Sequence, residues 1–206
     1  MITLPEKTVE RLCKYRRVLY NTIAAGKQHI FSHELANLLQ ITPVQVRRDI
    51  MLIGYSGTLR KGYDIKDLIS LIGNILDTPE GQKAAIIGLG NLGSSILTYF
   101  NGKRAKLSII AAFDIDPQKT NRVFGGVQCY PVDRLEEVIK AQGIRLAILT
   151  VPANQSPDIV EVLAMSGVKG IMNFTPKALH VPDNIYLEEY DMVTSMEKVA
   201  YFIKQN

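Results

Sequence analysis

The stretch KAAIIGLGNLG, residues 83–93, decides the fold of the larger part of this chain. Its apolar first half predicts a buried strand, and Ser94–Phe100 after it is expected to continue as a helix. Glycines at positions 88, 90 and 93 form a G-x-G-x-x-G pattern between the two elements. The first glycine permits a tight turn, the second lets the backbone approach a pyrophosphate, and the third lets the helix pack closely on the strand. The candidate dinucleotide contacts in this turn are Gly88, Leu89, Gly90, Asn91, Leu92 and Gly93.

Asp114 adds a second part of such a site. It ends the next apolar segment, Leu107–Asp114, 21 positions after Gly93. A carboxylate at that strand end accepts hydrogen bonds from the adenosine ribose hydroxyls and repels a 2′-phosphate, which favours NADH and NAD+ over their phosphorylated forms. The alternative is a tight structural turn in a sheet that binds nothing.

Strands and helices continue to alternate toward the C-terminus. The pattern predicts strands over 127–130, 146–151 and 170–174, and helices over 132–142 and 157–165. This alternation is typical of an α/β fold, a doubly wound parallel sheet of the Rossmann type. Ligands bind at the carboxyl ends of such strands, where Val151, Pro152, Asn173 and Phe174 fall. Each of these is a candidate cofactor contact or an ordinary residue of a strand-ending turn.

The first third of the chain predicts helices instead. They are expected to begin at Pro5, His33, Pro43 and Asp64. Thr42 and Gln45 form a capping-box signature around Pro43. Two helices joined by a short turn after a longer helix form a helix-turn-helix pattern, and the glycine-rich segment Gly54–Tyr63 predicts a wing.

The third of these helices carries a candidate DNA-binding face. Helical spacing places Val46, Ile50 and Ile53 in its buried stripe. Gln and Arg side chains can bond to adenine and guanine edges, and cations in a wing suit phosphates or the minor groove. The alternative is a solvated, charged helix face. The candidate DNA-binding residues are Thr42, Val44, Gln45, Arg47, Arg48, Arg60 and Lys61.

Composition and charge agree with two modules. The chain has 206 residues, of which 47% are hydrophobic and 21% charged, so it can form a packed core. Its net charge of +4 is uneven: residues 1–61 hold ten Lys and Arg and four Asp and Glu, a net +6, whereas residues 62–206 hold fourteen and sixteen, a net −2. A basic first module suggests a nucleic-acid partner. The segment Asp77–Gly81 is the expected linker.

Several functional classes are disfavoured by the sequence. No apolar run approaches the ~20 residues that span a bilayer, and the N-terminus resembles no signal peptide, so we expect a cytoplasmic protein without membrane contact. Cys13 and Cys129 cannot form a disulfide framework; Cys13 is expected in the core and Cys129 in a short strand. His29 and His33 are four positions apart, yet Ser32 is expected to cap the helix between them, so they should not share a metal-binding face.

Other functions remain open at this point. The glycine turn also suits a small NAD-dependent oxidoreductase or a CoA-binding domain. A dehydrogenase needs a positioned acid or base, and no histidine follows a strand end beside an obvious carboxylate partner. A third alternative is a DNA-binding protein whose second module only dimerises.

The combined motifs resemble the redox-sensing transcriptional repressors of the Rex family over nearly the whole chain, from Gln45-Val46-Arg47-Arg48-Asp49 through Gly88–Gly93 to Asn173-Phe174-Thr175-Pro176. The resemblance implies a winged-helix DNA-binding domain over 1–78, a Rossmann NAD(H)-binding domain over 79–190, and a dimerisation helix over 191–206. It implies a homodimer that exchanges this amphipathic helix and senses the NADH/NAD+ ratio, with NADH releasing operator DNA. It further implies that Arg17, Tyr99 and Asp191 couple the two domains.

The chain departs from the family pattern in the wing. Members commonly read Phe-Gly-x-Phe-Gly-x-Arg-Gly there, whereas this chain has Ile53-Gly54, Ser56-Gly57 and Leu59-Arg60. Ser94 stands where a basic residue is often found, and Tyr99-Phe100 replaces Tyr-Pro. These differences bear on how the wing meets DNA and on phosphate affinity.

Overall fold

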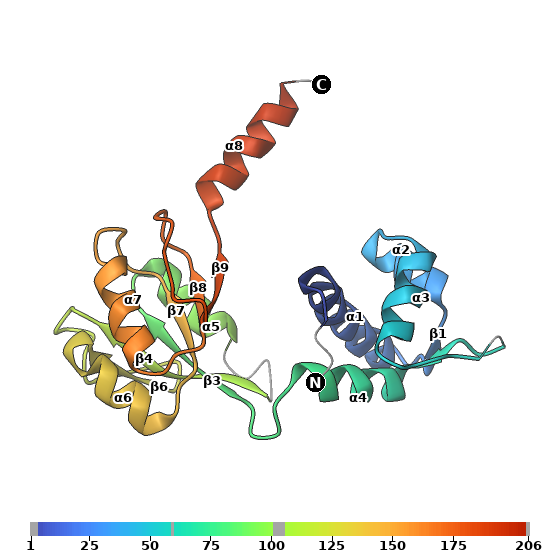
Figure 1. The fold of residues 1–206 in the computed structure, drawn as a ribbon, viewed down its shortest axis with the longest axis horizontal. Helices are drawn as coiled ribbons and strands as arrows, with labels where there is room; N and C mark the ends of the chain where they lie inside the picture. The colour runs from blue at the N-terminus through green and yellow to red at the C-terminus, as the bar shows by residue number, and fades with distance from the viewer. Residues whose placement is uncertain (1–3, 59, 101–105, 205–206) are drawn as a thin grey trace. The chain divides into compact units, whose positions relative to one another are not determined.

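The computed structural model describes residues 4–58, 60–100 and 106–204, and the chain divides into two compact units, Met1–Thr78 and Pro79–Asn206 (Figure 1). The division lies within the turn-rich segment after the last helix of the first unit. Arg16 holds the start of this segment, because its Nη1 donates to both carboxylate oxygens of Asp77 at 2.8 Å. Helical spacing places Arg16 within the apolar stripe of its helix and predicts that it snorkels or forms a pair, and it forms a pair.

The N-terminal unit is a winged helix. Thr42 caps α3 as predicted, with its Oγ1 accepting from the backbone N–H of Gln45 at 3.2 Å. Asp64 caps α4 in the same way, accepting from the N–H of Asp67. The wing is closed by a bridge between Thr58 and Gly62, and β1 pairs with β2 in antiparallel register. Its elements are α1 (Glu6–Ala24), β1 (His29–Ile30), α2 (Ser32–Leu39), α3 (Pro43–Leu52), β2 (Tyr63–Asp64) and α4 (Ile65–Leu76).

Two expectations for the core of this unit are wrong. Cys13 is exposed, and Leu38, which helical spacing predicts to face inward with Leu35 and Leu39, has 60% of its surface exposed. The buried side of α1 carries Leu12, Tyr15 and Leu19, and the hydroxyl of Tyr15 has a buried partner in Asp49. The predicted stripe of α3 is confirmed: Val46, Ile50 and Ile53 are buried.

The C-terminal unit is built on a seven-stranded sheet in the order β5-β6-β4-β3-β7-β8-β9. Every neighbouring pair is parallel except β5 and β6. The parallel strands follow the 3-2-1-4-5-6 order of a doubly wound sheet, as predicted. The strands are β3 (Gln82–Ile87), β4 (Leu107–Asp114), β5 (Val123–Phe124), β6 (Val127–Pro131), β7 (Leu146–Leu149), β8 (Gly170–Asn173) and β9 (Tyr186–Glu189).

Helices cover both faces of this sheet (Figure 1). Ala85 and Ile87 of β3 point to the face covered by α6 (Leu135–Gln142) and α7 (Ser156–Met165), whereas Ile86 points to the face covered by α5 (Asn91–Phe100). The side chains alternate in this way because successive residues of a strand point to opposite faces of the sheet. The helix expected over 132–142 begins as a 3-10 turn, η1 (Val132–Arg134).

The short strands β1, β5 and β9 were not expected from the sequence. Each spans only two to four residues and carries no clear alternation of its own. The amphipathic pattern over 193–203 predicts the last helix, α8 (Met192–Ile203), and each residue of this helix is exposed. Among the described residues, no helix is both long and apolar enough to cross a bilayer.

Candidate functional site

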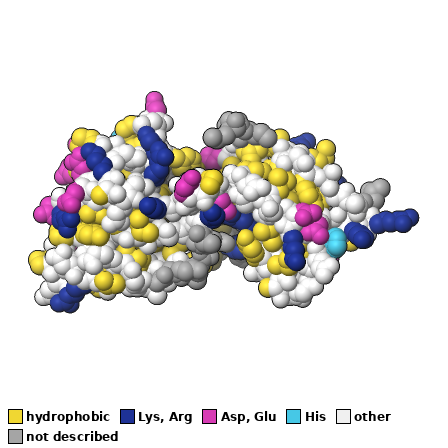
Figure 2. Space-filling model, turned by 90° about the horizontal axis from the view of Figure 1, so that it is seen from below, with side chains coloured by type: hydrophobic (Ala, Val, Ile, Leu, Met, Phe, Trp, Pro, Cys, Tyr) yellow, Lys and Arg dark blue, Asp and Glu magenta, His cyan; other side chains and the backbone are white. Residues whose placement is uncertain are grey.

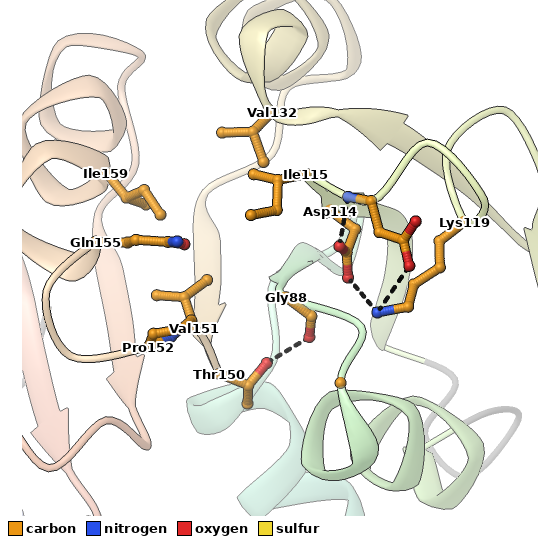
Figure 3. A pocket seen from close by; sticks show the side chains of 12 residues that line it. Gly88, Asp114, Ile115, Lys119, Val132, Thr150, Val151, Pro152, Gln155 and Ile159 are labelled. Carbon is orange, nitrogen blue, oxygen red and sulfur yellow. Dashed lines mark hydrogen bonds and ion pairs between the residues drawn. The ribbon is translucent and has the colours of Figure 1, made fainter.

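A cavity of about 450 Å³ opens at the carboxyl ends of β3, β4 and β7 (Figure 3). β3 and β7 are neighbours in the sheet but not in the chain order, so this is the point where the strand order reverses and where such sheets bind ligands. The volume lies within the ~300–1,000 Å³ of typical ligand sites. It is lined by Gly88, Gly90, Asp114, Ile115, Asp116, Lys119, Val132, Thr150, Val151, Pro152, Gln155 and Ile159.

Each of the three glycines in the turn has a different structural environment that explains why a residue without a Cβ stands there. Gly88 has a φ of +96°, and a Cβ there would lie 2.9 Å from the Thr150 carbonyl oxygen. A Cβ on Gly93 would lie 2.0 Å from the Gly88 carbonyl oxygen, so α5 packs directly on the turn. A Cβ on Gly90 would meet nothing within 4 Å, and this glycine lines the cavity. The geometry leaves room for a ligand beside Gly90 and the start of α5.

Asp114 is 7% exposed and is held from three sides. Its Oδ2 accepts from the backbone N–H of Leu89 at 2.8 Å and from Lys119 Nζ at 3.2 Å, and its Oδ1 accepts from the N–H of Asp116 at 2.9 Å. Burial acts to raise the pKa of this carboxyl, but the two backbone donors and the ammonium outweigh burial and lower the pKa. Asp114 is therefore a fixed anion at the edge of the cavity.

The structure brings some of the predicted cofactor residues to the cavity and not others. Gly88, Gly90, Asp114, Val151 and Pro152 line it.

The other residues of the turn, Leu89, Asn91, Leu92 and Gly93, belong to the turn or to α5 without lining the cavity. Asn173 does not line it either, because its Oδ1 accepts from Thr175 and its Nδ2 donates to the Lys177 carbonyl. Phe174 stacks on Tyr190, with ring centroids 4.8 Å apart.

Other residues that line the cavity were not among the predicted cofactor contacts. Thr150 Oγ1 lies 2.7 Å from the Gly88 carbonyl oxygen and so fastens β7 to the turn. Gln155 precedes α7, and Lys119 follows β4 in the turn that starts at Asp116. The only sequence signal for Lys119 is a cation five positions after a strand-ending carboxylate, which is a common pattern of solvated turns.

The candidate DNA-binding residues of α3 differ in the exposure of their side chains and in their hydrogen bonds to the rest of the chain. Val44 is 59% exposed, and Arg48 is exposed with no hydrogen bond to the described part of the chain. Arg47 donates to Ser32 Oγ at 3.1 Å. The capping box is only half formed, because the Gln45 side chain does not return to Thr42 but donates from Nε2 to Asp49 at 2.9 Å.

Asp49 is a buried anion at the back of α3, with 1% exposure. It accepts from Arg11 Nε at 2.6 Å and Nη2 at 2.8 Å, and from the Tyr15 hydroxyl at 2.6 Å. Burial acts to raise its pKa, but the hydrogen bonds from Arg11, Tyr15 and Gln45 lower it. Burial and the bond to Asp49 raise the pKa of Tyr15. This cluster ties α3 to α1 and fixes the orientation of the Gln45 amide, since a carboxylate can only accept.

Arg60 and Lys61 are exposed at the turn of the wing. The backbone N–H of Lys61 donates to Thr58 Oγ1, which holds the turn. Figure 2 shows Lys and Arg side chains protruding from the edge of the N-terminal unit. Of the atypical wing positions, Leu59 lies outside the described residues.

The residues implied to couple the domains lie in both units. Arg17 is exposed on α1, and Tyr99 is 65% exposed on α5. Asp191 caps α8, accepting from the N–H groups of Val193 and Thr194. Hydrogen bonds from Thr194 lower its pKa.

Among the described residues, no group of His, Cys, Asp and Glu is arranged to hold a metal. Cys129 is buried, and burial together with the nearby Asp114 raises its pKa to about 11, so this thiol is a poor nucleophile.

The two units match two family profiles. Residues 3–50 match a profile described as "Putative DNA-binding protein N-terminus", and residues 80–177 match one described as "CoA binding domain". A winged helix joined to a nucleotide-binding α/β domain defines a class of DNA-binding regulators that respond to a nucleotide.

Full-length relatives narrow this class. The chain is 40% identical to the redox-sensing transcriptional repressor Rex of Anoxybacillus flavithermus over 201 residues, which cover 98% of this chain and 94% of that protein. It is 37% identical to the protein of the same name from Geobacillus kaustophilus, with the same coverage. The chain belongs to the Rex family of redox-sensing transcriptional repressors.

Solved structures of a Rex-family repressor agree with this assignment. The chain is similar to RSP, a Rex-family repressor, in a crystal structure with β-NAD+ and operator DNA, with a TM-score of 0.90 and 28% identity over 100% of this chain and 94% of that one. It is similar to RSP in complex with β-NADH, with a TM-score of 0.85 and 27% identity over 100% and 96%.

Proposed function

We propose that this protein is a transcriptional repressor whose affinity for operator DNA is set by the NADH/NAD+ ratio. The observation that carries the proposal is the cavity at the reversal of strand order, with Gly90 open beside it and Asp114 fixed at its edge, in a chain that also holds a winged helix. NADH binding shifts the protein toward an arrangement that releases DNA.

The dinucleotide fits the residues present. The turn from Gly88 to Gly93 and the start of α5 offer backbone N–H groups for the pyrophosphate, with Leu89, Asn91 and Leu92 between the glycines. Asp114 accepts from the adenosine ribose, and Val151 and Pro152 line the path onward. We assign Phe174, stacked on Tyr190, to the nicotinamide end, and Asn173 to holding the loop that follows β8. When bound, the nicotinamide supplies the redox state that is sensed.

DNA contacts come from α3 and the wing. Val44, Gln45 and Arg48 face base edges, while Arg47 and the N-cap Thr42 lie at the flank of this face. Arg60 and Lys61 contact phosphates or the minor groove. Because the Gln45 amide is fixed by Asp49, it presents its oxygen and one N–H, which complement the N6–H donor and the N7 acceptor of adenine.

The partner that completes the sensor is a second copy of this chain. All of α8 is exposed, including Val193, Met196, Val199 and Ile203 on one stripe, and such a stripe suits burial in a homodimer. NADH can shift DNA binding only if it binds the two arrangements of the dimer with different affinity. A shift from ~99:1 to ~1:99 needs about 10⁴-fold differential affinity. Arg17, Tyr99 and Asp191 are the proposed coupling residues.

A binding role without catalysis is supported by the cavity lining. Its charged residues, Asp114, Asp116 and Lys119, are paired with one another, and no histidine is among the described lining residues. We assign the protein to the cytoplasm, where both DNA and the dinucleotide are found.

A gel shift with operator DNA tests the proposal. The DNA is taken from the promoter region of the protein's own gene or selected from a random library. We expect a shifted band with NAD+ or without nucleotide, and its loss with NADH. Asp114→Ala should keep the band in NADH. A band that NADH never changes would leave a plain DNA-binding protein, and NADH turnover with a carbonyl substrate would favour an oxidoreductase.

A further inference from the structure

Lys119 stands between the two carboxylates at the ribose end of the cavity (Figure 3). Its Nζ lies 3.2 Å from Asp114 Oδ2 and 3.9 Å from Asp116 Oδ2. The side chain of Lys119 is 33% exposed and that of Asp114 8%. The ammonium is therefore partly withdrawn from water and lies where a ligand would meet Asp114.

Lys119 occupies hydrogen-bonding capacity that a ribose would use. Each carboxylate oxygen has about two acceptor sites. Asp114 Oδ2 already accepts from Leu89 N–H and Lys119, whereas Oδ1 accepts from Asp116 N–H. The first ribose hydroxyl can take the remaining site on Oδ1, but a second must displace Lys119 from Oδ2.

The same cation changes the balance of charge at this end. The charged residues that line the cavity are Asp114, Asp116 and Lys119, so Lys119 reduces two negative charges to a net of one. A phosphate on the adenosine ribose would be repelled by the carboxylates and attracted by the ammonium at similar range. Lys119 released from Asp114 would be a donor for that phosphate.

Building on the proposed function, we propose that Lys119 is a specificity-determining residue that lets the site accept a 2′-phosphorylated dinucleotide as a second, weaker ligand. Asp114 sets the preference for a free ribose, and Lys119 limits how strict this preference is. The sensor then responds to the phosphorylated reduced dinucleotide when that ligand is in large excess.

Calorimetric titration of the full-length protein with NADH and with NADPH tests this inference. Wild type should bind both, NADPH more weakly. Lys119→Met should lower NADPH affinity at least about tenfold relative to NADH, with NADH binding unchanged or tighter. Lys119→Arg should keep the wild-type ratio, because the cation is retained. Lys140→Met, which removes an exposed lysine paired with Glu136 outside the cavity, is the matched control.

Two results would overturn the inference while leaving the proposed function intact. One is NADH binding by wild type with no NADPH binding at a thousandfold higher concentration than NADH needs. The other is an NADPH-to-NADH ratio that Lys119→Met leaves unchanged. Failure of wild type to bind either dinucleotide would instead count against the proposed function itself.

Discussion

The hydroxyl of Tyr15 in α1 donates a 2.6 Å hydrogen bond to the carboxylate of Asp49 in α3. The two residues are 34 positions apart, and both are almost completely buried. Arg11 of α1 bonds to the same carboxylate. The contact between α1 and α3 is therefore polar and directional instead of purely apolar. The position of α3 is thus fixed by bonds whose loss can be measured.

Tyr15→Phe removes only the hydroxyl and should lower the free energy of unfolding by about 2 kcal/mol, since a bond to a buried charge is lost. Urea unfolding of the full chain, followed by circular dichroism, measures this change. Tyr20→Phe is the control, because Tyr20 is 47% exposed on the same helix, and should change stability by less than ~0.5 kcal/mol. Equal effects in the two variants would argue against the role of the Tyr15–Asp49 bond.

Asp49 should also make stability depend on pH in acid. Its pKa is lowered in the folded protein, so its contribution is complete above the unfolded value of about 3.9 and is lost as the pH falls through the folded-state value. Asp49→Asn should cost ~3 kcal/mol at pH 7, by leaving Arg11 unpaired, and progressively less below pH ~4. The pKa of Asp114 is also lowered, but Asp114 is present in both the wild type and Asp49→Asn. The difference in unfolding free energy between these two proteins therefore reports on Asp49 alone. A cost that stays constant with pH would contradict the lowered pKa.

Two glycines of the same turn should respond in opposite ways to alanine. Gly93→Ala places a Cβ 2.0 Å from a backbone oxygen and should destabilise the C-terminal unit by roughly 3 kcal/mol or more. Gly90→Ala meets no atom within 4 Å and should fold normally, yet it should weaken NADH binding at least ~tenfold, because the methyl group enters the cavity. Thermal unfolding and NADH titration separate the two effects. A Gly90→Ala protein with full NADH affinity would place the pyrophosphate elsewhere.

Arg48 and Lys61 should affect DNA binding differently. Arg48→Ala should cost ~1–3 kcal/mol of operator binding and relax base preference at one position, whereas Lys61→Ala should weaken binding to all sequences and lower the salt slope by about one. Fluorescence anisotropy at several salt concentrations measures both. Lys66→Ala, an exposed lysine on α4, is the control and should change neither. Specificity that survives Arg48→Ala would place this residue on phosphates.

The apolar stripe of α8 should determine the oligomeric state. Met196→Asp with Val199→Asp should convert a dimer into a monomer in sedimentation equilibrium without changing the fold, because both side chains are exposed in the single chain. Lys198→Glu changes the opposite side of the same helix and should leave the dimer intact. If the double variant still sediments as a dimer, the interface lies elsewhere.

The sequence was most informative where one local signal sufficed. Thr42 with Pro43 predicted the start of α3, and the glycine turn predicted the strand, the helix and the sheet around them. It was least informative where a residue depends on a distant partner. Nothing in the local sequence singled out the role of Asp49, because its partners Arg11 and Tyr15 lie more than 30 positions earlier. Lys119 was not predicted for a similar reason, since only the fold brings it to the cavity.

In the proposed site, the hydrogen bond from Leu89 N–H to Asp114 links the residue that selects the cofactor to the backbone of the turn from Gly88 to Gly93. In a dinucleotide-binding fold, the preference for an unphosphorylated ribose depends on the acidic residue at this strand end, and exchanging that residue for a small neutral one weakens the preference. Here the same exchange removes an acceptor that the turn itself uses, so a Gly or Ala at position 114 would loosen the backbone around Gly88 and Gly90. Evolution, or an engineer who wants a sensor for the phosphorylated dinucleotide, is therefore restricted to substitutions of Asp114 that keep an acceptor, such as Asn or Ser, with the cation of Lys119 retained.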